Sequence, residues 1–164
     1  MMEHKKRTPA QGSKVFAQEN IFIDTSAFYA LMDRSDRYHE FAKAQWPALL
    51  EDEIILQTSN YTVNETLTLL QYRLGSEAAM RWSRDVLAVM RVHWVNETLH
   101  RQAYELWLTL GRRNFSLVDC VSYITMHQNQ IEKAFCFKNG YAQQGFKLVP
   151  ESREYHFKVF PNAD

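Results

Sequence analysis

The feature that most constrains this chain of 164 residues is an apolar run that ends in an acid and a helix signal. Residues 21–23 read Ile-Phe-Ile, three β-forming residues with no polar residue among them, a pattern typical of a strand buried on both faces. Asp24 follows directly, and Thr25 or Ser26 can cap a helix that begins at Ala27. This order predicts an α/β fold, in which ligands bind just beyond the carboxyl ends of the strands. Asp24 would lie at that edge.

The rest of the chain repeats the alternation of strand and helix patterns. Short runs of β-forming residues are bounded by turn residues, and segments with helical periodicity lie between them. This alternation predicts a mostly parallel sheet of four to five strands joined by right-handed crossovers. After the first strand and helix, we expect strands at 54–56, 92–95, 134–137 and 146–149, and helices at about 36–51, 60–74, 77–90, 97–110 and from 117 onward.

The composition describes a folded chain without a strong charge bias. Hydrophobic residues make up 46% of the sequence and aromatic residues 13%, which excludes a disordered chain. Lys and Arg together number 19, as do Asp and Glu, so the protein is not built to coat nucleic acid nonspecifically. We expect no membrane span, because no stretch approaches the roughly 18 apolar residues that one needs. The absence of a secretory signal and the presence of only two cysteines favour a reducing cytoplasm.

Three acidic residues share one structural setting although they are far apart in the sequence. Asp24 ends a strand, Glu65 lies on the helix after the second strand, and Asp119 opens the helix before the fourth strand. Helices that follow parallel strands begin at one edge of the sheet, so the fold can gather these acids. Clustered carboxylates repel one another unless a cation lies among them, and such oxygen ligands suit Mg²⁺ or Mn²⁺. Each acid also fits a plainer role, as a helix cap or a solvated helix residue.

Four segments in this order resemble the motifs of the PIN-domain ribonucleases, the family of the VapC-type toxins. Residues 22–26 resemble the first motif, and residues 63–66, Val-Asn-Glu-Thr, are similar to the second. Residues 115–123 match most closely, because Ser-Leu-Val-Asp resembles the helix start that carries the third acid. Residues 135–137, followed by Gly-Phe at 145–146, resemble the last strand and loop. The resemblance covers about residues 20–150.

The resemblance implies a three-layer α/β/α fold and a metal-dependent endoribonuclease. It implies that Asp24, Glu65 and Asp119 are catalytic and hold Mg²⁺ or Mn²⁺, with Thr25 or Ser26 supporting them by hydrogen bonds. The implied partners are an RNA substrate, an antitoxin protein and a second copy of the chain in a homodimer. We therefore divide the chain into a basic N-terminal arm at 1–20, a PIN-like domain at 21–150 and a C-terminal extension at 151–164.

One position departs from the family pattern. The family usually places a fourth Asp after the last core strand, and alignment on Phe137 and Tyr141 puts Lys138 there. At an effective dielectric near 20, an ammonium about 5 Å from a divalent ion repels it by several kcal/mol. An inward lysine therefore predicts reduced activity or a single metal, whereas an outward one can bind an RNA phosphate. Residues 138–140, Lys-Asn-Gly, also suit a tight hairpin, which would break the family topology.

Two further questions stay open from the sequence. Arg112 and Arg113 precede the Asp119 motif and are candidate contacts to RNA phosphates, although a solvated basic turn fits them equally well. Because of Lys138, the alternative to a nuclease is a degenerate PIN domain that binds RNA or a protein without cleaving it. Binding of a divalent ion would favour the nuclease.

Overall fold

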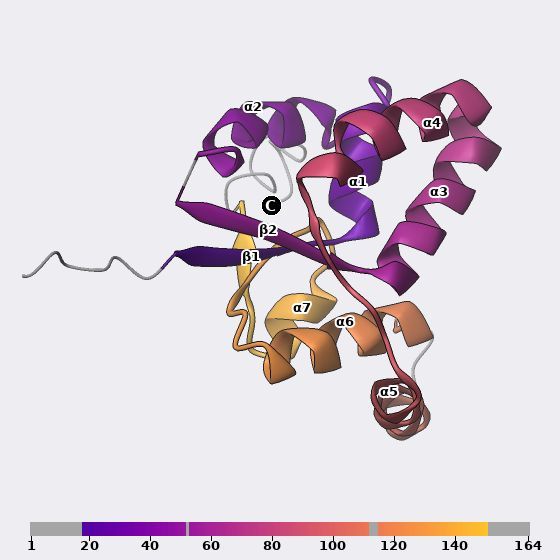
Figure 1. The fold of residues 1–164 in the computed structure, drawn as a ribbon, viewed down its shortest axis with the longest axis vertical. Helices are drawn as coiled ribbons and strands as arrows, with labels where there is room; N and C mark the ends of the chain where they lie inside the picture. The colour runs from indigo at the N-terminus through magenta and orange to yellow at the C-terminus, as the bar shows by residue number, and fades with distance from the viewer. Residues whose placement is uncertain (1–17, 52, 112–114, 151–164) are drawn as a thin grey trace, which may run out of the picture.

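The computed structural model describes residues 18–51, 53–111 and 115–150. They form a parallel sheet of five strands in the order β3-β2-β1-β4-β5, with helices on both faces (Figure 1). Every neighbouring pair of strands is parallel, so all carboxyl ends lie at one edge. The predicted α/β fold with a parallel sheet is therefore confirmed. The strands are β1 (Glu19–Ile23), β2 (Ile54–Ser59), β3 (Arg91–His93), β4 (Lys133–Phe135) and β5 (Lys147–Val149).

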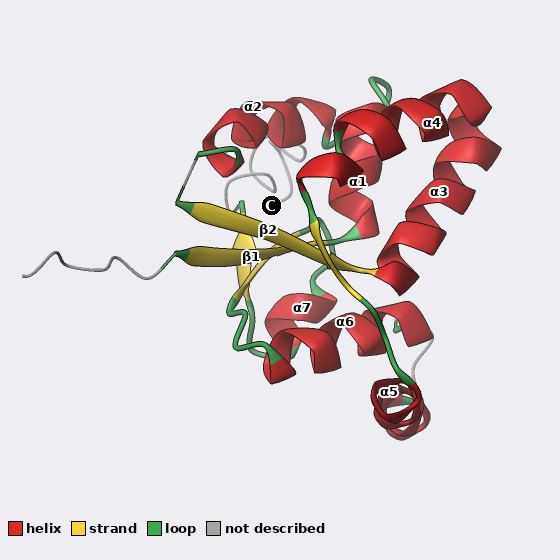
Figure 2. Ribbon diagram, in the orientation of Figure 1, coloured by secondary structure: helices red, strands yellow, loops and turns green. Residues whose placement is uncertain are grey.

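The helices divide into two layers. Figure 2 shows α1 to α4 on one side of the sheet and α5 to α7 on the other. No helix in the described ranges has both the length and the apolar character needed to cross a bilayer. The helical segments are α1 (Thr25–Met32), α2 (His39–Leu49), α3 (Asn60–Leu74), α4 (Ser76–Asp85), the short 3₁₀ segment η1 (Leu87–Val89), α5 (Glu97–Leu110), α6 (Leu117–Gln128) and α7 (Gly140–Gln143).

Strand β1 is the centre of the packing on both faces. Ile23 points into the core beneath α1 to α4, where it joins Phe28 and Trp82. Phe22 points the other way, into the core that contains Tyr141. Both β1 side chains have no exposed surface, and burial of such a side chain stabilises a fold by about 1.5–3 kcal/mol. The buried strand predicted from residues 21–23 is therefore central to the sheet, and it fixes the position of the residue that follows it.

Several local predictions were wrong in instructive ways. The Asn-Gly hairpin is excluded, because β4 and β5 are parallel and α7 begins at Gly140 between them. The helix expected at 77–90 ends at Asp85 and continues as η1. The helix expected at about 36–51 is shorter, because α2 spans His39–Leu49, with Pro47 in its last turn. The N-cap of α1 is Asp24 itself, rather than Thr25 or Ser26. The cap role and the site role of Asp24 are thus not alternatives.

Candidate active site

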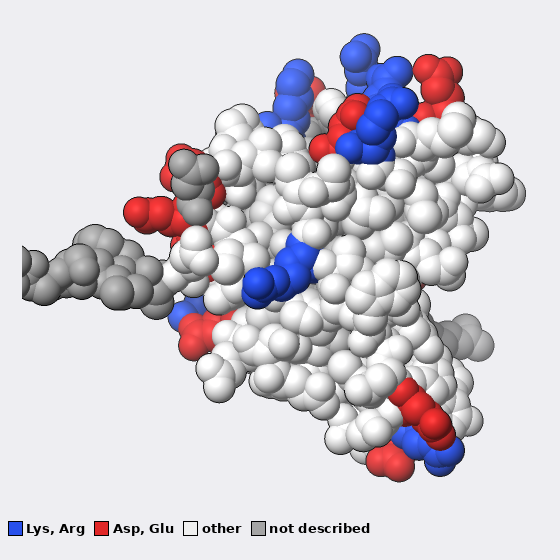
Figure 3. All heavy atoms as spheres, in the orientation of Figure 1, with Lys and Arg blue, Asp and Glu red and all other residues white. Residues whose placement is uncertain are grey.

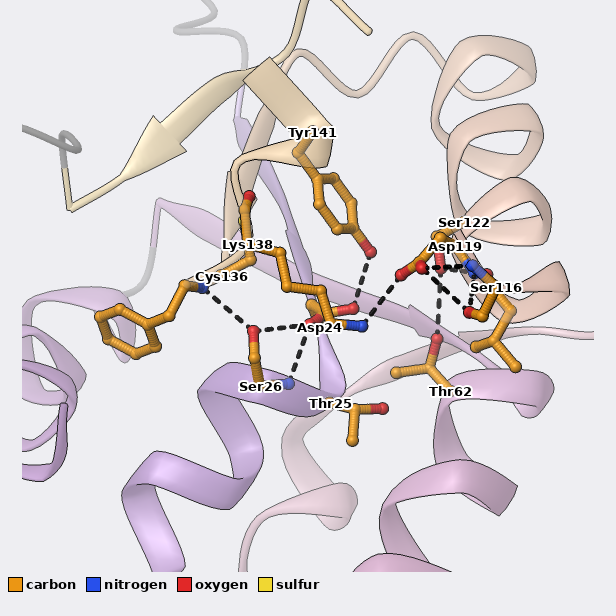
Figure 4. A network of polar contacts seen from close by, with 12 residues as sticks. Asp24, Thr25, Ser26, Thr62, Ser116, Asp119, Ser122, Cys136, Lys138 and Tyr141 are labelled. Carbon is orange, nitrogen blue, oxygen red and sulfur yellow. Dashed lines mark hydrogen bonds and ion pairs between the residues drawn. The ribbon is translucent and has the colours of Figure 1, made fainter. Parts of the chain in front are cut away.

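Asp24 lies immediately after β1, with its side chain buried and its carboxylate held by donors from two segments. Its Oδ2 atom accepts hydrogen bonds from the Ser26 backbone N–H at 2.8 Å and the Ser26 hydroxyl at 2.6 Å. Its Oδ1 atom accepts one from the Tyr141 hydroxyl at 2.8 Å (Figure 4). Burial, followed by the charge of Asp24, raises the pKa of Tyr141 well above its ordinary value, so this hydroxyl remains a donor. The carboxylate therefore has one fixed orientation.

Asp119 is held in a similar way at the start of α6. Ser116 and Asp119 form a capping box, in which each side chain bonds the backbone N–H of the other residue. Asp119 Oδ2 accepts from the Ser116 N–H at 2.8 Å and from the Ser116 hydroxyl at 2.9 Å. Only 4% of Asp119 is exposed. Local sequence at the helix start thus orients the carboxylate and leaves its Oδ1 atom for another partner.

Lys138 lies between these two aspartates. Its Nζ atom is 2.9 Å from Asp119 Oδ1 and 3.7 Å from Asp24 Oδ2. The lysine side chain is 37% exposed, whereas the side chains of Asp24 and Asp119 are 1% and 6% exposed. Burial by itself would lower the pKa of Lys138, but the two carboxylates outweigh it and raise that pKa. Lys138 is therefore a charged partner of both aspartates, and it points inward (Figure 4).

The backbone around Lys138 is tied to the same cluster. The Phe137 N–H donates to the Ser26 hydroxyl at 3.0 Å, and that hydroxyl in turn donates to Asp24. The Cys136 thiol lies 3.7 Å from the Lys138 carbonyl oxygen. At Gly140, a Cβ atom would lie 2.6 Å from the Tyr123 hydroxyl oxygen, so a larger residue there would force that side chain to move. These contacts on both sides fix the path of the chain that carries the ammonium.

Glu65, in the second turn of α3, has the least supported carboxylate of the cluster. Its Oε2 atom is buried and has no hydrogen-bond partner within the described residues. Burial is the largest cause that raises the pKa of Glu65; a hydrogen bond from Thr25 and the charge of Lys138 lower it, and the charges of Asp24 and Asp119 raise it. Asp24, Asp119 and Lys138 are therefore close enough to Glu65 for their charges to affect its pKa. Thr25 also accepts a hydrogen bond from Thr66, at 3.2 Å.

A small cavity opens beside the lysine. Its volume is about 290 Å³, and it is bordered by Asp119, Lys138, Phe115 and Tyr123. A larger hollow of about 770 Å³ lies between α1, α2 and α4, but it is reached from the far end of α1 and contains none of the clustered acids. The smaller cavity gives a ligand access to Asp119 and Lys138.

Comparison with known proteins decides the family. A family model for the PIN domain matches residues 21–142. The chain belongs to the PIN-domain family. The resemblance inferred from the motifs is thereby confirmed, and so is its VapC-type character, because the same region is related to a VapC protein.

The relatives of this PIN domain include a curated nuclease and two solved structures. The chain is 35% identical over 130 residues to the 23S rRNA-specific endonuclease VapC20 of Mycobacterium tuberculosis, covering 79% of this chain and 97% of the relative. The crystal structure of that organism's VapC20, described as a sarcin–ricin loop cleaving toxin, superposes with a TM-score of 0.70 at 34% identity and covers 77% and 95% of the two chains. FitAcB from Neisseria gonorrhoeae has a TM-score of 0.57 at 17% identity, covers 78% and 95%, and supports the fold alone.

VapC-type PIN nucleases depend on a divalent metal. The acidic side chains of this PIN domain are of the chemical type that binds such an ion. Asp24, Glu65 and Asp119 offer only carboxylate oxygens, and Glu65 Oε2 is buried without a hydrogen-bond partner in the part of the chain that the structure describes. Within the described ranges, however, no three His, Cys, Asp or Glu side chains are arranged to hold an ion as they stand. The Lys138 ammonium lies between the carboxylates of Asp24 and Asp119.

The structure also shows what sequence reasoning missed. Tyr141 served only as an alignment marker, yet its hydroxyl bonds Asp24 across 117 positions of sequence. Ser116 is the N-cap of α6, and it also orients the Asp119 carboxylate. Arg112 and Arg113 lie outside the described residues.

Proposed function

We propose that this chain is a VapC-type toxin that hydrolyses phosphodiester bonds of RNA with Mg²⁺ or Mn²⁺ at Asp24, Glu65 and Asp119. One observation carries the proposal: the fold brings these acids to one edge of the sheet in a chain related to an endonuclease over 97% of that relative's length. Each acid lies at a different structural point, after β1, on α3 and on α6. These three acids come from separate elements, and the fold is what brings their charges together.

The residues divide the work at this site. Asp24, Glu65 and Asp119 would hold the divalent ion, which when bound lowers the pKa of a water molecule and neutralises charge on the scissile phosphate. Ser26 and Ser116 keep the two aspartates oriented through the hydrogen bonds already described. Oriented carboxylates need no rearrangement during the reaction, which is the main source of electrostatic catalysis.

RNA would be recognised locally rather than through a broad basic surface. On the face seen in Figure 3, Lys and Arg side chains alternate with Asp and Glu at the ends of the molecule, and much of the area between them is uncharged. We propose Lys138, Arg112 and Arg113 as the phosphate contacts. Phe115 and Tyr123 border the cavity beside Lys138 and are almost fully buried, so they form its apolar wall. The RNA to test first is the sarcin–ricin loop of 23S rRNA, the target named for VapC20.

The proposal includes a protein partner and a location. An antitoxin would cover the site or an apolar surface, and a homodimer is the proposed state of the free toxin. Large apolar side chains are exposed on several elements and are available for such contacts, among them Tyr72, Trp94 and Leu108. Both cysteines are buried and unpaired, which agrees with action in the cytoplasm, where the RNA is found.

Cleavage of a defined RNA tests the proposal. The purified chain is incubated with a sarcin–ricin stem-loop and with intact 23S rRNA, in Mg²⁺, in Mn²⁺ and in EDTA. We expect cleavage only with a divalent ion, and its loss in Asp24→Asn and Glu65→Gln. Glu77→Gln is the matched control, because Glu77 is an exposed acid on α4. Binding of either RNA without cleavage under every metal condition would contradict the proposal and establish the alternative.

That alternative, a PIN domain that binds RNA without cleaving it, has one observation in its favour. Lys138 already neutralises part of the charge that an ion would neutralise. The cleavage assay separates the two functions, since a binding module leaves the RNA intact under every metal condition.

A further inference from the structure

The two aspartates of the proposed active site already share a cation that belongs to the chain. The Lys138 ammonium is within 4 Å of a carboxylate oxygen of each aspartate. A divalent ion held by the same pair would have to occupy the same region, and the two positive charges would repel each other. The lysine is thus placed where it affects metal binding directly.

Each carboxylate oxygen of Asp24 and Asp119 accepts a hydrogen bond from the protein. Asp24 Oδ1 is bonded by Tyr141 and Asp24 Oδ2 by Ser26. Asp119 Oδ2 is bonded by Ser116 and Asp119 Oδ1 by Lys138. All four aspartate oxygens therefore have donors from the protein. Each oxygen keeps a second lone pair, so a divalent ion would have to share these oxygens with donors that the chain already supplies.

Lys138 differs from the other paired lysines of the described chain. Lys147 pairs with Glu132 at 3.2 Å, but both side chains are more than two-thirds exposed, so that pair resembles an ordinary surface contact. The partners of Lys138 are almost fully buried, and the backbone on either side of Lys138 is fixed by the Phe137–Ser26 hydrogen bond and by the packing at Gly140. The fold therefore fixes the position of the Lys138 ammonium.

We propose that Lys138 is a resident cation of the active site, which balances Asp24 and Asp119 in the absence of metal and competes with a divalent ion for them. The inference rests on the proposed function for the identity of the competing ion. Its consequence is a site that is stable when empty of metal, has a weakened affinity for divalent ions, and releases the ammonium when an ion binds. The released ammonium is then free to contact an RNA phosphate.

Metal binding measured without RNA tests this role. The titrant is Mn²⁺, followed by calorimetry, and the proteins are the wild-type chain, Lys138→Met and the control Lys147→Met. Methionine keeps much of the length of the lysine side chain and removes its charge. We expect Lys138→Met to bind Mn²⁺ at least ~10-fold more tightly than wild type, because one repulsive charge has gone, and Lys147→Met to match wild type. Equal affinities in wild type and Lys138→Met, or no binding by either, would overturn the inference.

Thermal unfolding gives a second readout of the same competition. In EDTA we expect Lys138→Met to melt at a lower temperature than wild type, because two buried carboxylates then face each other without a cation. Added Mn²⁺ should raise the melting temperature of Lys138→Met more than that of wild type. The same response to Mn²⁺ in both proteins would count against a resident cation.

If Lys138→Met fails to fold, the wild-type protein still provides a test. The rate at which an amine-reactive reagent modifies Lys138 is compared with and without Mn²⁺ by peptide mass spectrometry, with Lys147 as the internal reference. We expect Mn²⁺ to increase labelling of Lys138 and to leave Lys147 unchanged. Mn²⁺ that binds in an Asp24-dependent manner without changing the labelling of Lys138 would overturn the inference.

The outcomes separate this inference from the proposed function. Tighter Mn²⁺ binding by Lys138→Met, with no RNA cleavage by any variant, would support the resident cation and contradict the nuclease. Metal-dependent cleavage by wild type, with equal Mn²⁺ affinity in Lys138→Met, would support the nuclease and contradict the resident cation.

Discussion

The two sides of the acidic cluster are built differently. On one side, Asp24 and Asp119 accept hydrogen bonds from serine, tyrosine and backbone donors and share the Lys138 ammonium. On the other side, Glu65 has a buried oxygen without a partner in the described chain and a pKa raised first of all by burial. Hydrogen bonds to the charged form stabilise a carboxylate, whereas burial without them destabilises it. An added cation therefore gains most on the Glu65 side.

The difference has a local origin. Asp24 is the N-cap of α1, and Asp119 lies in the first turn of α6, where backbone N–H groups and the helix dipole favour a negative charge. Glu65 lies within α3, whose backbone donors are already used by the helix. The carboxylates of Asp24 and Asp119 are thus stabilised by their positions at helix starts. The Glu65 carboxylate has no such backbone support within the described chain. Four substitutions test this contrast.

Asp24→Asn has the largest expected effect on RNA cleavage, because it removes the charge of the more buried of the two hydrogen-bonded aspartates. An amide is neutral, and its N–H₂ group would face donors in place of an acceptor oxygen. We expect RNA cleavage to fall by roughly 100-fold or more, as for the loss of one charged group that stabilises a transition state. Cleavage within twofold of wild type, in a variant with an unchanged melting temperature, would remove Asp24 from the active site.

Tyr141→Phe removes one of the hydrogen bonds that support Asp24. The hydroxyl is fully buried and donates to Asp24 Oδ1 at 2.8 Å, so its removal leaves a buried, charged oxygen without that donor. We expect the free energy of unfolding in urea to fall by about 2 kcal/mol. Tyr104→Phe is the control, because Tyr104 is an exposed residue of α5, and it should change stability little. Equal losses in the two variants would show that the Asp24 contact adds nothing.

Gly140→Ala tests the packing that positions Lys138. The added methyl group would lie 2.6 Å from the Tyr123 hydroxyl oxygen and 3.0 Å from Phe115 Cε1, so one of them must move. We expect a loss of about 1 kcal/mol in unfolding free energy, as for modest overpacking. Tyr123→Phe removes the nearer atom, so the double variant should recover part of that loss. Strict additivity of the two substitutions would place the strain elsewhere.

The contrast also explains how far the sequence predicted this site. Asp24 and Asp119 were found because a buried strand end and a helix start are local patterns, readable within a few residues. The direction of Lys138 was left open, because it depends on carboxylates 19 and more positions away. The Tyr141 contact was missed altogether, since only the packing of α7 against the sheet brings it to Asp24. Local propensity likewise suggested a hairpin at 138–140, and the parallel pairing of β4 with β5 overrode it.

Glu65→Gln tests the unsupported side and has the smallest expected effect on the protein without metal. A carboxyl whose pKa is raised on folding binds its proton more tightly in the folded state than in the unfolded state. Its contribution to stability is therefore fully present below the ordinary pKa of 4.5 and is lost as the pH rises through the raised value. Glutamine does not titrate, so the variant lacks this loss.

The measurement is the free energy of unfolding in EDTA across this pH range, taken as the difference between wild type and Glu65→Gln. We expect wild type to lose stability relative to the variant as the pH rises above 4.5, and the difference to level off once Glu65 is ionised. Mn²⁺ should reverse the order at neutral pH, because only the carboxylate gains from the cation. A difference that does not vary with pH would mean that Glu65 is as well supported as the two aspartates, and the contrast between the two sides would then be wrong.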